Sequence, residues 1–100
     1  MYARLVTGNI APKRLEEVIR IWRESVAPSA KQKKGFKNAR LLVDRERGTV
    51  ASIGLWETEA DFQSTTDWNR TQLTKFADLF EKPPSVEGYE VVAEVLAEYG

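Results

Sequence analysis

Three tryptophans are the residues of this chain best suited to binding a flat organic molecule. Trp22 falls on the apolar stripe of an expected first helix, Trp56 ends an expected strand, and Trp68 lies in an expected second helix. Each indole ring offers a large apolar surface and one N–H donor. Directed at one interface between sheet and helices, the three rings could line an aromatic pocket. The alternative is that all three are core residues, since large aromatic side chains also dominate ordinary core burial.

Asn38 and Arg40 are polar candidates for orienting such a ligand. We expect them to share one face of a strand with Phe36 and Leu42, because alternate residues of a strand point the same way. A polar group among apolar neighbours needs a partner when it is buried. A phenol, carboxylate or carbonyl of a ligand would be such a partner, with Arg40 as a bidentate donor. A hydrogen bond or ion pair across a dimer interface, for instance with Glu94, would serve as well.

The missing residue types limit the chemistry. The chain has no cysteine and no histidine, which excludes disulfides, thiol nucleophiles, Cys/His zinc sites and histidine bases. No spacing of Asp and Glu indicates a hard-ion site, so we expect neither metal nor cofactor. Ser52 lacks a neighbouring base and is a candidate for hydrogen bonding to a substrate, not for nucleophilic attack. The candidates for catalysis are Trp56, Ser52 and Arg40, and Arg4 has the same two interpretations as Arg40.

The composition is that of an ordinary globular domain, which we expect to span residues 1–100. Hydrophobic residues make up 42% of the chain and charged residues 30%. No apolar run is long enough to cross a membrane and no signal peptide is evident, so we expect a cytoplasmic protein without a membrane partner. Residues 31–47 carry a net charge of +5 and residues 57–100 one of −7. We interpret these as solvated faces; the alternative is a basic patch for an anionic partner or another subunit.

The elements that must position these residues follow the order β-α-β-β-α-β. Strands are expected over residues 2–7, 36–43, 49–56 and 89–97. The first helix begins near Pro12 and is broken or kinked at Pro28. The second begins at a capping box that starts with Thr58, has a break near residues 64–67, and ends before Pro83.

This order predicts an α+β, ferredoxin-like fold, in which a four-stranded antiparallel sheet carries two helices on one face. The segments Ala39–Val43 and Val50–Trp56 are apolar at odd and even positions alike. Strands of that kind are usually covered on both faces. Two helices cover only one face, so we predict a homodimer whose sheets pack together through the open face as a dimeric α+β barrel.

Five short segments spread over nearly the whole chain carry a family resemblance: Tyr2-Ala3-Arg4, Pro12-Lys13, Gly35-Phe36, Leu55 to Asp61, and Gly88 to Val91. In these segments the sequence resembles the antibiotic biosynthesis monooxygenase-like domains of the dimeric α+β barrel superfamily. The resemblance implies the ferredoxin-like fold and a dimer. It is a poorer guide to activity, because function lives in sites and not in folds.

Two chemistries are attached to that superfamily. One is quinone-forming oxidation of aromatic compounds without metal or flavin, for which members offer an Asn, a Trp four residues later and a Tyr six residues after that. Trp56 matches the Trp, whereas Ser52 stands at the Asn position and Phe62 at the Tyr position. Arg70 or Lys75 would supply the basic residue expected on the second helix. The other chemistry, haem degradation, uses a histidine, which this chain lacks.

The leading hypothesis is a cofactor-independent monooxygenase-like enzyme that acts on a small aromatic or other apolar organic molecule. Its pocket would lie between sheet and helices, and its candidate substrate contacts are Trp22, Asn38, Arg40, Ser52, Trp56, Phe62 and Trp68. The alternative is a non-catalytic dimeric module that binds a small ligand or acts in stress. No nucleic acid is expected, because the Lys34-Gly35-Phe36 match to an RNA-recognition motif is not followed by stacking aromatic residues.

Overall fold

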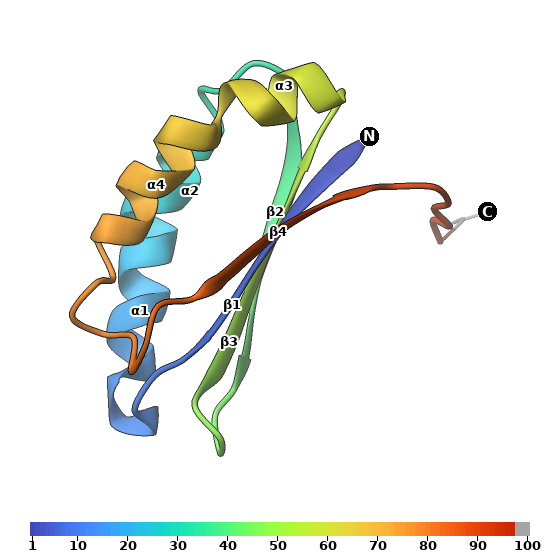
Figure 1. The fold of residues 1–100 in the computed structure, drawn as a ribbon. Helices are drawn as coiled ribbons and strands as arrows, with labels where there is room; N and C mark the ends of the chain where they lie inside the picture. Colours follow the sequence, from blue (N-terminus) through green and yellow to red (C-terminus); the bar gives the residue numbers. More distant parts are fainter. Residues whose placement is uncertain (98–100) are drawn as a thin grey trace.

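A four-stranded sheet with helices against one face makes up the computed structural model, which describes residues 1–97 (Figure 1). All neighbouring strands are antiparallel, and their order across the sheet is β2-β3-β1-β4. The strands are β1 (Tyr2–Asn9), β2 (Phe36–Asp44), β3 (Thr49–Trp56) and β4 (Ser85–Glu90). The predicted ferredoxin-like α+β fold, with both helical regions on one face, is confirmed.

The first helical region changes its winding along its length. It comprises a 3₁₀ turn (Pro12–Arg14), α1 (Leu15–Ile21), a π-helical stretch (Trp22–Val26) and α2 (Ala27–Ala30). The amide of Ala27 donates to the carbonyl of Trp22, five residues back. Pro28 follows directly and has no N–H to donate. The chain therefore becomes irregular at the predicted place, but it stays helical through Pro28 instead of ending there.

The second helical region is split into α3 (Glu59–Ser64) and α4 (Thr66–Thr74). The Thr58 hydroxyl accepts a hydrogen bond of 3.0 Å from the amide of Asp61, which confirms the predicted cap. Thr65 separates the two helices, within the predicted break. No helix in the part of the chain that the structure describes is both long and apolar enough to cross a lipid bilayer.

The last strand is shorter and begins earlier than predicted. β4 ends at Glu90, which lies opposite Tyr2 of β1. Because β1 begins at Tyr2, residues 91–97 have no described strand left to pair with, apart from one bond from the Val91 amide to the Met1 carbonyl. The predicted strand over residues 89–97 is therefore wrong over most of its length, since its apolar residues were taken for sheet residues.

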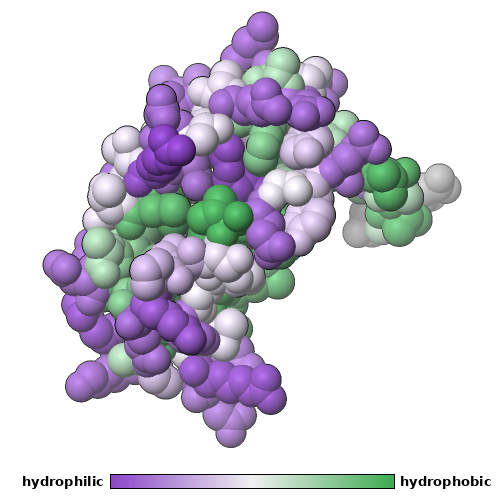
Figure 2. Space-filling view, viewed as in Figure 1, coloured by the Kyte–Doolittle hydropathy of each residue, from purple (hydrophilic) through white to green (hydrophobic). Residues whose placement is uncertain are grey.

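The segment that follows β4 carries exposed apolar side chains. Val92, Val95 and Leu96 are 84%, 94% and 73% exposed. This segment runs away from the helices to the far side of the sheet (Figure 1). Figure 2 shows it as an apolar projection that stands apart from the rest of the molecule.

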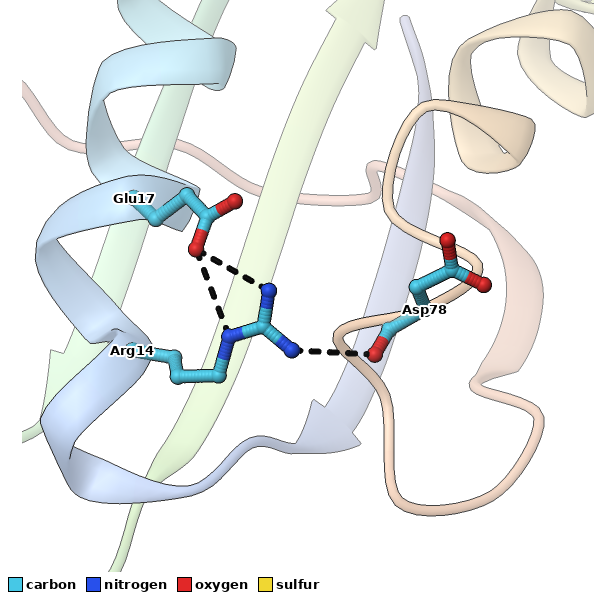
Figure 3. A network of polar contacts seen from close by, with 3 residues as sticks. All are labelled: Arg14, Glu17 and Asp78. Atoms are coloured by element: carbon cyan, nitrogen blue, oxygen red, sulfur yellow. Dashed lines mark hydrogen bonds and ion pairs between the residues drawn. The ribbon is translucent and has the colours of Figure 1, made fainter.

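The more tightly packed part of the interior, here called the core end, lies where β1 ends and α1 begins. Its buried side chains are Ile10, Leu15, Val18, Val50, Phe76 and Leu79. Figure 3 shows how Arg14 connects the first helical region to the loop after α4: its guanidinium donates to the Glu17 carboxylate at 3.1 and 3.3 Å and to the Asp78 carbonyl at 3.3 Å. Ion pairs this exposed contribute little stability, so burial of the apolar side chains holds this end together.

The sheet face opposite the helices, here called the open face, is uncovered in the single chain. Leu5 of β1, Leu42 of β2, and Ile53 and Leu55 of β3 lie on it, because alternate strand residues point to opposite sides of a sheet. Leu42 is exposed over about half of its surface. The helices thus cover one face as expected, and the homodimer stays a prediction.

Candidate functional site

A cavity of about 290 Å³ lies between the sheet and the helices, beyond the core end. Its floor includes three small residues on the helix-facing side of the sheet: Ala39 of β2, and Ser52 and Gly54 of β3. Ala27 and Ala30 of α2 line it from the helix side. Small side chains on both layers leave the space empty. Ligand pockets usually measure about 300–1,000 Å³, so this cavity lies at the small end of that range. It therefore suits a small molecule of one or two rings.

Trp22, Trp56 and Trp68 all line this space, which we call the tryptophan cavity. The rings of Trp56 and Trp68 meet edge to face with their centroids 6.3 Å apart. Nε1 of Trp22 donates to the Ser52 hydroxyl at 3.2 Å, and Nε1 of Trp68 donates to the Ser29 hydroxyl at 2.7 Å. The three rings thus surround one cavity, and two of their N–H groups already have protein partners.

Trp56 differs from the other two tryptophans in its hydrogen bonding. The residue is 3% exposed, and its Nε1 is buried without a hydrogen-bond partner among residues 1–97. Leaving a buried donor unpaired costs about 1–3 kcal/mol. A ligand oxygen that came within hydrogen-bonding distance of Nε1 would remove that cost.

Two glycines of the sheet seat the aromatic rings of this region. A Cβ on Gly54 would lie 2.8 Å from Cζ3 of Trp56, so the indole occupies the place where a side chain would stand. A Cβ on Gly88 of β4 would lie 2.7 Å from Cζ of Phe62. Glycine within a strand often marks such a close approach. The wall of the cavity therefore depends on residues that carry no side chain.

Arg4 is a functional candidate to which the sequence interpretation gave too little weight. It lies on β1 opposite Gly54, and it is only 5% exposed. Its Nη1 donates to the Thr65 hydroxyl at 3.0 Å and its Nη2 to the Phe62 carbonyl at 3.2 Å. The guanidinium carbon also lies 4.3 Å from the centroid of the Phe62 ring and 5.2 Å from that of Trp56. A signal existed in the sequence, because Arg4 alternates with the apolar Val6 on one face of the strand and is the strand's charged residue.

The electrostatics of the cavity are positive. Burial lowers the pKa of Arg4 from its ordinary value, but arginine stays protonated at neutral pH. The charged residues that line the cavity are Arg4 and Lys31, and no aspartate or glutamate among the described residues lines it. Asn69 and Gln72 of α4 add neutral amides. The site can bind, orient and stabilise an anion, but it offers no carboxylate or imidazole as a base.

Asn38 and Arg40 do not reach the cavity. A β-bulge at Lys37 shifts the register of β2, so that Phe36 lies opposite Trp56 and lines the cavity, while Asn38 and Arg40 lie on the open face. The prediction that Phe36 shares a face with these two residues is wrong, because one inserted residue exchanges the faces on either side of it. The open face is where the alternative interpretation, a contact across a dimer, would place them.

The remaining sequence candidates lie around the cavity without lining it. Phe62 packs against Tyr2 and Trp56, with ring centroids 4.7 and 6.3 Å apart, and so supports the wall from outside. Arg70 and Lys75 are exposed. Arg70 pairs with Asp67 on the same helix at 3.2 Å. Neither basic residue of the second helical region therefore takes the place expected from the resemblance.

Comparison with known proteins gives a consistent result. The family model "Antibiotic biosynthesis monooxygenase" matches residues 1–72. The structure superposes on a monooxygenase from the gene ActVA-Orf6 of Streptomyces coelicolor, solved with the ligand nanaomycin D, with a TM-score of 0.79 and 14% identity over 97% of this chain and 92% of that one. A mutant of SnoaB, a cofactor-independent oxygenase from Streptomyces nogalater, superposes with a TM-score of 0.71 and 15% identity over 94% and 95% of the two chains.

A protein of unknown function from Nitrosomonas europaea, NE2512, is also similar, with a TM-score of 0.73 and 21% identity over 98% of this chain and 95% of that one. No curated protein matches the sequence. At these identities the solved structures show the fold alone, so the activity has to be argued from the residues of the cavity.

Proposed function

Because the chain belongs to the antibiotic biosynthesis monooxygenase family, we propose that it is a cofactor-independent oxygenase that acts on an aromatic molecule of one or two rings. The observation that carries this proposal is the tryptophan cavity, whose walls are aromatic and whose Trp56 Nε1 is buried without a partner. A flat apolar molecule with a hydroxyl or carbonyl oxygen would fill the space and accept that N–H.

In the proposed reaction the substrate itself reduces molecular oxygen. With 1-naphthol as the example, the ring loses the hydroxyl proton to water, and the carbon para to that oxygen forms a bond with O₂. The O–O bond then breaks, one oxygen atom becomes the second carbonyl of 1,4-naphthoquinone, and the other leaves as water. The ring supplies the four electrons that O₂ accepts. The protein's part is to bury and orient the ring and to hold its oxygen.

Oxygen uptake with 1-naphthol, together with quinone absorbance, tests the proposal. We expect uptake by the native protein and a loss of about tenfold or more in kcat/KM for Trp56→Phe, which keeps an aromatic ring but removes the donor. Ala39→Val fills the cavity floor without altering any tryptophan and should remove uptake as well. Arg23→Met, on an exposed helix position, serves as the control. Uptake that is absent from the native protein, or unchanged in both cavity variants, would contradict the proposal.

A ligand-binding module without catalysis is the second candidate, and a specific observation favours it. The cavity offers no carboxylate among its described lining residues, and the chain has no histidine, so the site lacks an obvious proton acceptor. Such a module would be stabilised by aromatic ligands through mass action. A rise in melting temperature with 1-naphthol but no oxygen uptake would select this alternative.

We also propose that a second copy of the chain covers the open face. Leu5, Ile53 and Leu55 form its apolar centre, and the exposed apolar segment after β4 runs to the same side of the sheet. A lysine at the centre of such an interface would be buried without a partner. We therefore expect Ile53→Lys to halve the mass measured by sedimentation, while Ser64→Lys on α3 leaves it unchanged. A native protein that sediments as a monomer would contradict this proposal.

A further inference from the structure

We propose that the substrate carries an ionised acidic group and that Arg4 binds its anionic oxygen inside the tryptophan cavity. The group is a carboxylate or an acidic hydroxyl, which share the same recognition chemistry. The inference rests on the proposed function, because it names the class of molecule that the same cavity takes.

The first support is that Arg4 is a buried cation without an anion. Its partners are the hydroxyl of Thr65 and the carbonyl of Phe62, both neutral, and no ion pair forms with it within the described residues. Buried charges in proteins are usually paired, because an isolated charge is costly to remove from water. A guanidinium has five N–H bonds, and only two of those of Arg4 have partners in residues 1–97. The others are free for an acid, which guanidinium binds in a bidentate manner.

The second support is the sign of the charges around the cavity. Lys31 lines it together with Arg4, and Nζ of Lys33 lies 5.9 Å from the Trp68 ring. Neither lysine forms an ion pair in the part of the chain that the structure describes. A cavity bordered by cations attracts anions and disfavours a cationic ligand. Lys31 and Lys33, two basic residues of the segment over residues 31–47, thus acquire a role beyond that of a solvated face.

The third support is that a neutral side chain would serve the fold as well. Arg4 contacts the rings of Phe62 and Trp56, and a methionine of similar length would make apolar contacts there without desolvating a charge. The two hydrogen bonds of Arg4 hold its guanidinium in one orientation beside the cavity. A cation that is held in one orientation beside a cavity, without an ion-pair partner in residues 1–97, is the arrangement expected of a group that binds an anionic ligand.

Calorimetric titration with matched probes tests the inference. We expect the native protein to bind 2-naphthoate about tenfold to a hundredfold more tightly than neutral 2-naphthamide, which has the same shape. A second pair, 2-hydroxy-1,4-naphthoquinone and 1,4-naphthoquinone, separates an acidic hydroxyl from a carboxylate as the preferred group. Arg4→Met should abolish the preference and leave 2-naphthamide binding within about twofold, as expected for a lost charge-assisted hydrogen bond. Arg23→Met, which removes an exposed charge elsewhere, should keep the preference.

Folding is checked on the same samples. We expect the melting temperature of ligand-free Arg4→Met to equal or exceed that of the native protein, because the variant no longer buries a charge. If Arg4→Met does not fold, Arg4→Lys decides, because it keeps the charge but loses the bidentate geometry. Its preference for 2-naphthoate over 2-naphthamide should be smaller than that of the native protein but still present.

The outcomes separate this inference from the proposed function. Equal binding of 2-naphthoate and 2-naphthamide by the native protein, with 1-naphthol oxidation intact, would overturn the role of Arg4 and leave the oxygenase proposal standing. A preference that survives in Arg4→Met would do the same. Binding of none of the probes, with no oxygen uptake, would overturn both.

Discussion

The layer between sheet and helices is more tightly packed at its core end, where a hollow of about 60 Å³ borders Val18, Val50 and Phe76, than at the tryptophan cavity of about 290 Å³, although the same strands build both. Along the helix-facing side of β3, Val50 belongs to the core end, whereas Ser52 and Gly54 form the cavity floor. The same side of β1 carries Arg4 at the cavity. A few small and polar residues in otherwise apolar strands are thus enough to turn part of a core into a site.

The two ends also differ in what they contribute to stability. The core end buries apolar side chains that contact one another, which is the main favourable term in folding. Among residues 1–97 the cavity combines empty space, an N–H of Trp56 without a hydrogen-bond partner and a buried Arg4 without an ion-pair partner. Each of these lowers stability. Local departures of this kind from good packing are expected at functional sites.

We expect the largest loss of stability from a substitution that removes a buried side chain of the core end. Leu15→Ala removes a side chain that is almost fully buried, and we expect a loss of about 2–5 kcal/mol in the free energy of unfolding, measured with urea. The matched pair is Val18→Ala, at a valine of the core end that is 2% exposed, and Val26→Ala, at a valine that lines the cavity. Val26→Ala should cost clearly less than Val18→Ala, because Val26 already borders empty space. Equal losses in the two valine variants would mean that the two ends are packed alike.

A smaller effect is expected when a methyl group is added beneath the wall of the cavity. Gly54→Ala places a Cβ where the Trp56 ring lies, so the ring has to move. We expect a loss of about 1–3 kcal/mol, typical of overpacking, and a changed tryptophan fluorescence spectrum. Ala51→Ser, at an open-face position three residues before Gly54 in β3, should leave the fluorescence as it is. An unchanged spectrum in Gly54→Ala would show that the indole is not seated on this glycine.

The smallest effect compares two tryptophans of the cavity. Trp68→Phe removes the hydrogen bond to Ser29 and should cost about 0.5–1.5 kcal/mol beyond the loss of ring area. Trp56→Phe removes an N–H without a partner, so its stability loss should be smaller, although Trp56 is the more deeply buried ring. Thermal unfolding of both variants measures the difference. A larger loss for Trp56→Phe would contradict the assignment of its N–H to a ligand.

Local patterns in the sequence predicted most of the fold. The β3 boundaries, Thr49 and Trp56, and the cap at Thr58 follow from residues close together in the chain, and the structure places them as expected. The end of β4 does not follow in this way, because it depends on where β1, its distant partner, begins. The bulge at Lys37 is a further non-local event, and it reversed the faces assigned within β2.

The site was predictable to the extent that its residues lie in regular elements. Trp22, Trp68 and Ser52 meet at the cavity because helical and strand periodicity placed them on the inner faces. Asn38 and Arg40 were predicted on the wrong face of β2, because the sequence pattern did not reveal the bulge. The importance of Arg4 depends on its having no ion-pair partner among the described residues, and only the assembled structure shows that.

A crystal structure of the native protein grown with 1-naphthol in the absence of oxygen would test most directly whether the tryptophan cavity is a binding site. We expect the naphthol ring to lie between Trp22, Trp56 and Trp68, with its oxygen within hydrogen-bonding distance of Trp56 Nε1. A cavity closed by side chains, or one that stays empty while naphthol binds elsewhere, would contradict the assignment of this site.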